Sequence, residues 1–207
     1  FAGLQWESCC VAVRLLGRVF DQPQAAERYA ERFDRMLADV AARLRDVRTR
    51  PRVLYFSPKT LTQPHLVVEW WIRAAGGESV TDDGRTVESR SFTLEQLLAW
   101  NPDILIVSGH EEAETVRREP RFANLAAVRT GRILVAPSGA HTWGNRTSEQ
   151  PLTVLWAAKH FHPERFGDID VVAETQAFYH DIFGADLSAA QVREILDGGP
   201  RTTLAAR

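Results

Sequence analysis

The sequence predicts an α/β fold, a three-layer sandwich in which helices cover both faces of a mostly parallel sheet, preceded by a long helix. Two observations carry this prediction. From residue 52 onward, short apolar runs of strand length alternate with helical segments, which is typical of a parallel sheet with helical crossovers. Before residue 50, apolar residues recur every three or four positions, which indicates helices alone.

The composition is that of an ordinary globular protein. The 207 residues are 44% hydrophobic and 25% charged, enough to form a sizeable core. No run of about 18 apolar residues is present, so no membrane-spanning helix is predicted. A net charge of -2 gives no overall attraction to nucleic acid, which we do not expect as a partner. Cys9 and Cys10 are adjacent, a spacing that does not favour a normal disulfide between them.

Two helices are predicted in the first part of the chain. Residues 4–20 carry apolar side chains at helical spacing, and the sequence Asp21-Gln22-Pro23 then marks a stop and a restart. Residues 24–48 continue as one helix with charged side chains on its other faces. At 1.5 Å per residue, such a helix is roughly 35 Å long and could bridge two bodies.

The rest of the chain alternates strands and helices. Strands are predicted at residues 52–56, 104–107 and 133–135, and helices at 64–75, 94–100, 111–118, 121–128, 151–161, 171–183 and 188–196. The three strands end in polar loops at residues 57–65, 108–112 and 138–149. Because ligands of parallel sheets bind outside the carboxyl ends of the strands, these loops are the predicted functional edge.

The third loop holds the strongest candidate contacts. An indole at Trp143 would be partly exposed unless it covered a ligand or packed against its own loop, and we predict a ligand contact. Arg146 could pair with a carboxylate or catecholate oxygen through its planar guanidinium, or it could be solvated.

Histidines and hydroxyl groups at the same edge are further candidates. His110 and His141 could ligate an open coordination position on a chelated metal. Thr60 in the first loop and His65 at the start of the next helix could also reach a ligand. No H-x-x-x-H or C-x-x-C spacing occurs, so we expect neither a metal site built by this chain alone nor a resident cofactor.

Several stretches of the chain, taken in order, carry a family resemblance. They are residues 74–77, 97–107 (ending in W-N-P-D-I-L-I-V), 143–152, 155–159, 162–166, 168–170 and 178–187. Their order and spacing resemble those of the solute-binding proteins of ABC importers for iron-siderophores, haem, cobalamin and related metal complexes. The resemblance covers essentially the whole chain, although no single motif is diagnostic.

The resemblance implies two α/β lobes joined by one long, rather rigid helix, with the ligand between the lobes. Residues 1–20 would then be the end of the N-terminal lobe or a lead-in helix. Residues 21–50 would be the connecting helix and 51–207 the C-terminal lobe, with the N-terminal lobe absent from this sequence. The ligand half-site on that other lobe is outside this sequence.

The resemblance also implies a function. The protein would be a monomeric, non-enzymatic binding protein, periplasmic or lipid-anchored outside the cytoplasm, that delivers a metal chelate to an ABC permease in the membrane. An exposed acidic residue on each lobe docks on permease arginines in this family. The corresponding region here is the loop before residue 150, where Glu149 or Asn145 would be the docking residue.

A metal-dependent α/β enzyme is the alternative. It would hold a hydrolytic metal ion with His110, His141 and Glu111 and keep one position open for water. The sequence shows no nucleophile elbow and no phosphate-binding glycine loop. For a binding protein, siderophore, haem, cobalamin, a simpler metallophore and a metal oxyanion all remain open as ligands.

Overall fold

The centre of the fold is a parallel sheet. The computed structural model describes residues 4–199, with side chains from residue 10; the side chain of Cys9 and residues 200–207 lie outside this description. Four parallel strands are ordered β3-β1-β5-β6, with bounds β1 Arg52–Tyr55, β3 Glu78–Ser79, β5 Ile104–Val107 and β6 Ile133–Val135. Val53 lies opposite Ile104, and Leu105 lies opposite Ile133. The parallel sheet predicted from the three apolar runs is confirmed.

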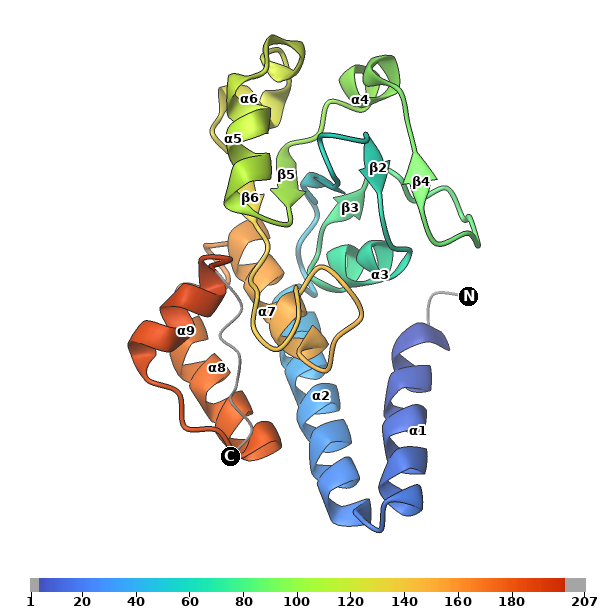
Figure 1. The fold of residues 1–207 in the computed structure, drawn as a ribbon, viewed down its shortest axis with the longest axis vertical. Coiled ribbons are helices and arrows are strands. Elements are labelled where there is room, and N and C mark those ends of the chain that lie inside the picture. The colour runs from blue at the N-terminus through green and yellow to red at the C-terminus, as the bar shows by residue number, and fades with distance from the viewer. Residues whose placement is uncertain (1–3, 200–207) are drawn as a thin grey trace.

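Helices cover both faces of this sheet, because its strands carry apolar side chains on both faces. Successive side chains of a strand point to opposite faces, so Val53 and Tyr55 join one buried cluster and Leu54 and Phe56 join the other. The first face is covered by α3 (Val67–Ala74) and α7 (Gln150–Phe161), and the second by α4 (Leu94–Trp100), α5 (His110–Arg118) and α6 (Ala126–Arg129). The predicted three-layer sandwich is therefore confirmed (Figure 1).

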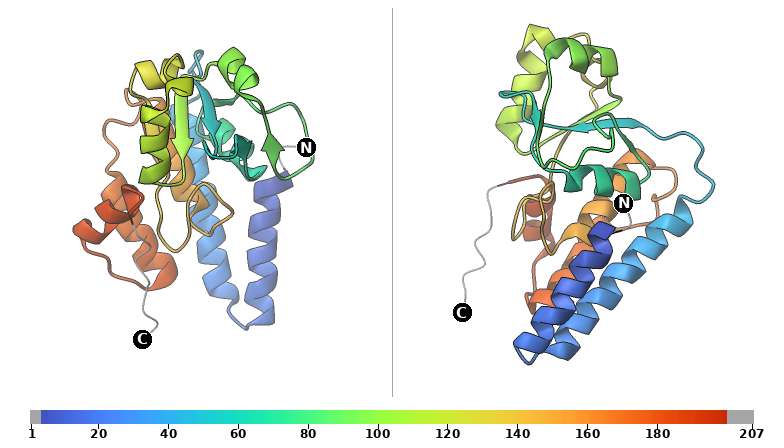
Figure 2. Two further views of the ribbon diagram at one scale, coloured as in Figure 1. Left: turned by 45° about the horizontal axis from the view of Figure 1, so that its top comes forward. Right: turned by 90° about the vertical axis from the view of Figure 1, so that its right-hand side faces the viewer.

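The chain begins with a helical hairpin that extends away from the sheet (Figures 1 and 2). It consists of α1 (Leu4–Val19) and α2 (Pro23–Arg43). A Cβ atom at Gly17 would overlap Ala26, so this glycine allows the helices to approach closely near the turn. Arg14 forms a bidentate ion pair with Glu27 at 2.8 and 2.9 Å. With 21 residues, α2 is about 31 Å long.

The long helix is shorter than the sequence predicts. It ends at Arg43 instead of residue 48, because the Arg45 N–H donates to the carbonyl of Ala42 and tightens the last turn. Pro51 then disfavours helical backbone at the residue before it, and the chain enters β1. No helix among the described residues is long and apolar enough to cross a membrane.

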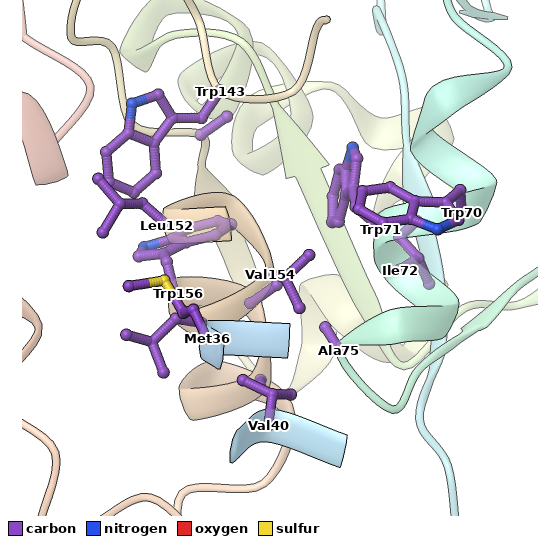
Figure 3. Packing of buried hydrophobic residues seen from close by; sticks show 14 of the residues in the cluster. Met36, Val40, Trp70, Trp71, Ile72, Ala75, Trp143, Leu152, Val154 and Trp156 are labelled. Carbon is purple, nitrogen blue, oxygen red and sulfur yellow. The ribbon is translucent and has the colours of Figure 1, made fainter. Parts of the chain in front are cut away.

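Trp70 and Trp71 are both buried, although only one of two adjacent helical residues can face the sheet (Figure 3). Trp71 meets Tyr55 of the sheet edge-on, with ring centroids 6.2 Å apart. Trp70 stacks on Phe33 of α2 at 6.3 Å. Because α2 lies on the outer side of α3, this helix is covered on both sides.

A second helical layer lies beside α2 and α7. It contains α8 (Val171–Phe178), a π-helical turn η2 (Tyr179–Phe183) and α9 (Ala189–Leu196). The predicted helix over 171–183 is thus divided at Tyr179. The Arg32 guanidinium bonds Glu174 at 3.3 Å and Asp181 at 3.2 Å, which ties this layer to α2.

Besides β3, two further short strands were not predicted from the sequence. β2 (Thr62–Gln63) and β4 (Arg90–Ser91) pair antiparallel and frame the segment of residues 80–89. A 3₁₀ turn, η1 (Pro120–Phe122), occupies part of the predicted helix over 121–128. Within this segment, the buried side chain of Arg85 lies 2.9 Å from that of Glu69 in α3, and Gln63 donates to Glu69 at 3.2 Å. This pair anchors the segment to α3.

Candidate functional site

The three predicted loops meet at one edge of the sheet, because β1, β5 and β6 run parallel and end together. The loops after β1 and β5 are tied by Glu112, in the first turn of α5. Its carboxylate accepts from the Ser57 hydroxyl and from the Ser108 N–H, each at 2.9 Å. The Tyr55 hydroxyl lies 3.1 Å from the Ser108 hydroxyl, and burial raises the Tyr55 pKa above its ordinary value. The phenol therefore stays neutral and acts only as a hydrogen-bonding group.

The loop between β6 and α7 folds around the carboxylate of Glu149. Glu149 is fully buried and accepts from the N–H groups of Ala140 at 3.2 Å and His141 at 3.1 Å. The Trp143 indole donates at 2.9 Å and the Thr147 hydroxyl at 3.0 Å. The carboxylate is thus surrounded by donors from its own loop.

This arrangement corrects two predictions. Trp143 is 0% exposed and belongs to the buried cluster that contains Leu152 and Trp156 of α7, so it shows no face to a ligand (Figure 3). The alternative hypothesis, that the Trp143 indole packs against its own loop, is the one that the structure shows. Glu149 is also 0% exposed, so the expectation of an exposed docking carboxylate at this position is wrong. Both residues stabilise the loop through a buried hydrogen bond between their side chains.

The middle of the same loop rests on the sheet. A Cβ atom at Gly144 would lie 2.5 Å from the Tyr55 ring, so only glycine allows the backbone to approach this closely. The Trp71 indole donates to the Gly144 carbonyl at 3.4 Å, and the Thr153 hydroxyl donates to the Trp143 carbonyl at 3.1 Å. The loop is therefore packed on both sides.

Charged and polar side chains gather on the exposed side of this loop. Arg146 bonds Glu88 at 2.6 Å, and the Leu66 N–H bonds the other oxygen of Glu88 at 3.4 Å. Burial lowers the pKa of His65, Glu88 counteracts this shift, and the charges of Arg146 and His141 add to it. The His65 imidazole is therefore neutral to lower pH than usual. We call His65, Glu88, His141 and Arg146 the charged edge.

Glu88 was not found by sequence reasoning. It lies in the segment before β4, which carries no motif and follows none of the three predicted strands. The Arg146 guanidinium, through its hydrogen bond, holds the Glu88 pKa below its usual range. Their side chains are 58% and 52% exposed, so both can contact a ligand.

The remaining predicted residues lie on other parts of the edge. Thr60 is exposed in the turn between β1 and β2, where its carbonyl accepts from the Thr62 hydroxyl at 3.2 Å. His110 is the first residue of α5, and its Nε2 lies 3.6 Å from Asp197 near the end of α9. Asn145 is half-buried, with its N–H bonded to the Thr142 carbonyl at 3.1 Å.

The sequence comparison decides the family. A family model described as "Periplasmic binding protein" matches residues 2–140, which is more than half of the chain. The chain belongs to the periplasmic binding protein family. Membership in the periplasmic binding protein family implies an extracytoplasmic location.

Solved periplasmic binding proteins share the fold. A periplasmic solute binding protein from Veillonella parvula superposes with a TM-score of 0.81 at 25% identity, covering 93% of this chain and 61% of that one. MolA of Haemophilus influenzae with bound molybdate gives 0.77 at 22% identity, covering 88% and 58%. The chain therefore spans about three fifths of the length of these structures.

A curated relative of this periplasmic binding protein has a named ligand. The molybdate-binding protein MolA of Haemophilus influenzae is 26% identical over 97 residues, which are 45% of this chain and 28% of MolA. Helicobacter pylori CeuE, solved with nickel and histidine, matches with a TM-score of 0.71 at 20% identity, over 89% of this chain and 60% of CeuE. The fold thus serves proteins with different metal-containing ligands.

The metal-dependent enzyme is not supported in this periplasmic binding protein. Within residues 10–199, whose side chains the structure describes, no three His, Cys, Asp or Glu residues form a group that could hold a metal ion. The charged group beside His110 is Asp197, at 3.6 Å. His141 instead lies close enough to His65 to lower the pKa of that imidazole. The site of His110, His141 and Glu111 that the alternative requires is not assembled.

Proposed function

We propose that this chain is the ligand-binding C-terminal lobe, with its connecting helix, of the substrate-binding component of an ABC importer. The protein would capture an iron-siderophore, cobalamin, haem or related metal complex, or a metal oxyanion, and deliver it to a membrane permease. The observation that carries the proposal is the charged edge, which lies exposed where the loops of a parallel sheet converge, in a chain of the periplasmic binding protein family.

The chemistry of the charged edge favours a ligand with anionic oxygen atoms. Arg146 presents a planar donor group that fits carboxylate, catecholate or oxyanion oxygens. The imidazoles of His65 and His141 can donate hydrogen bonds to such oxygens or fill an open metal position. Thr60 and His110 are candidate contacts on the neighbouring loops.

An apolar stripe on α1 supports a second body beside this lobe. Val11, Leu15, Leu16, Val19 and Phe20 are 51–70% exposed on this helix and the turn after it. Contiguous exposed apolar surface usually marks a contact. We propose that this stripe packs against the N-terminal lobe. In this proposal residues 1–20 are the end of the N-terminal lobe or a lead-in helix, residues 21–50 connect the lobes, and residues 51–207 form the C-terminal lobe.

The proposal also covers the oligomeric state, the location of the protein and its contact with the permease. The protein would act as a monomer, either free in the periplasm or held by a lipid anchor. Because Glu149 is buried, we propose Asn145 as the docking residue on this lobe. Asn145 is half-buried and comes one residue before Arg146, whose side chain is 58% exposed.

Replacing Arg146 by alanine tests the ligand assignment. Hydrogen bonds to charged groups contribute about 1.5–3 kcal/mol, so the variant should bind the captured ligand about tenfold or more weakly. The measurement is a tryptophan-fluorescence titration of the full-length protein with molybdate, a ferric siderophore, nickel-histidine, haem and cobalamin.

The matched control is Arg118→Ala. Arg118 lies on α5 with its side chain 82% exposed and pairs only with Glu114 in the described part of the chain. Its loss should leave affinity unchanged. Equal affinities of the Arg146 variant and the wild type would remove the charged edge from the ligand site.

A further inference from the structure

Glu149 is a buried carboxylate whose partners are uncharged. No ion pair among the described residues includes it, although removing an ionised carboxylate from water is costly. Five donors surround it, from Ala140, His141, Trp143, Thr147 and Tyr179. Hydrogen bonds to an ionised acceptor are roughly twice as strong as neutral ones, so this shell offsets the desolvation.

Four of the five donors precede Glu149 by two to nine residues in the same loop. The carboxylate therefore closes the loop on itself. The fifth donor, the Tyr179 hydroxyl, comes from the π-helical turn and also accepts from the Ala140 N–H at 3.1 Å. A Cβ atom at Gly139 would overlap both the Glu149 carboxylate and the Tyr179 hydroxyl, so this glycine makes room for their contact.

The loop held in this way carries two residues of the charged edge. The His141 N–H is itself a donor to Glu149 at 3.1 Å, and Arg146 lies between the donors Trp143 and Thr147 in sequence. We propose that Glu149 is the positioning residue of the ligand site: it fixes His141 and Arg146 before the ligand arrives, without touching it. This inference rests on the proposed function for the identity of the site.

The test is Glu149→Gln, which keeps the shape and replaces one oxygen by an NH₂ group. Oε1 accepts from Ala140, Trp143 and Tyr179, and Oε2 accepts from His141 and Thr147. An NH₂ group in place of Oε1 faces the N–H groups of Ala140 and Trp143, and one in place of Oε2 faces the His141 N–H; only the hydroxyls of Tyr179 and Thr147 can turn to accept. Backbone amides of Ala140 and His141 should then exchange with solvent about tenfold faster, while those of β5 keep their protection.

NMR of the full chain gives a second readout that a loss of overall stability would not produce. The Trp143 indole N–H donates to Glu149 at 2.9 Å, so its proton resonance should move upfield in Glu149→Gln as this hydrogen bond weakens. Glu31→Gln, on the exposed side of α2, is the matched control and should change neither readout. If Glu149→Gln does not fold, Tyr179→Phe removes one donor only and should accelerate exchange of the Ala140 amide.

The outcomes separate the two proposals. Unchanged exchange at Ala140 and His141 and an unmoved indole resonance would overturn the positioning role. A loosened loop supports that role, and titration with molybdate should then show affinity reduced about tenfold if molybdate is bound by the wild type. The Arg146→Ala titration tests the proposed function separately, because that variant leaves the Glu149 contacts in place.

Discussion

Replacing Trp143 by alanine is expected to lower the free energy of unfolding by about 3–5 kcal/mol, the usual cost of truncating a large buried aromatic side chain. The indole is fully buried against the cluster that contains Leu152 and Trp156. Its removal also takes one donor from the buried carboxylate of Glu149. Urea unfolding followed by circular dichroism measures the change.

Trp143→Phe separates the two contributions. Phenylalanine keeps most of the apolar contact and loses only the N–H donor, so its cost should be about 1–3 kcal/mol. A loss below 1 kcal/mol in Trp143→Ala would show that the indole is exposed in solution. That result would restore the interpretation of Trp143 as a ligand contact.

Gly144→Ala is the substitution with the next largest expected effect. The added Cβ atom would lie 2.5 Å from the Tyr55 ring, which is buried and cannot move easily. Overpacking of this kind costs about 1–3 kcal/mol, and the shifted loop should also weaken ligand binding. The change in unfolding free energy is measured in the same urea experiment.

Gly109→Ala is the matched control at the same edge of the sheet. An added Cβ atom there meets nothing within 4 Å, and the backbone at Gly109 is extended with φ -163°. Its stability should stay within about 0.5 kcal/mol of the wild type. Equal stability of the two variants would contradict the close packing of Gly144 on the sheet.

The parallel sheet could be predicted because its central strands are continuous apolar runs. The run at residues 104–107 is buried at every position, and its four apolar residues, which follow Asn101-Pro102 and precede Ser108-Gly109, have the length and the bounding turn residues of a buried strand. β3 has only two residues, Glu78 and Ser79, and carries no such pattern. Its place at the edge is set by pairing with β1, which is a tertiary contact.

The candidate site was predicted less completely than the fold. The edge and the loop before α7 were predicted from topology, and His65, His141 and Arg146 lie near one another there. Glu88 joins them only through tertiary folding. The burial of Glu149 has a partial signal in the sequence, since Thr147 two residues before an acid at a helix start can share hydrogen bonds with it.

The most direct measurement is native mass spectrometry of the full-length protein with molybdate, a ferric siderophore, nickel-histidine, haem and cobalamin. It compares the wild type with the double variant His65→Ala, Arg146→Ala, because these side chains belong to the charged edge but come from two different loops, before α3 and before α7. The wild type should retain one of these ligands as a 1:1 complex, and the double variant should lose it. A wild type that retains none of the ligands, or a double variant that retains the ligand equally, would contradict a ligand site at the charged edge.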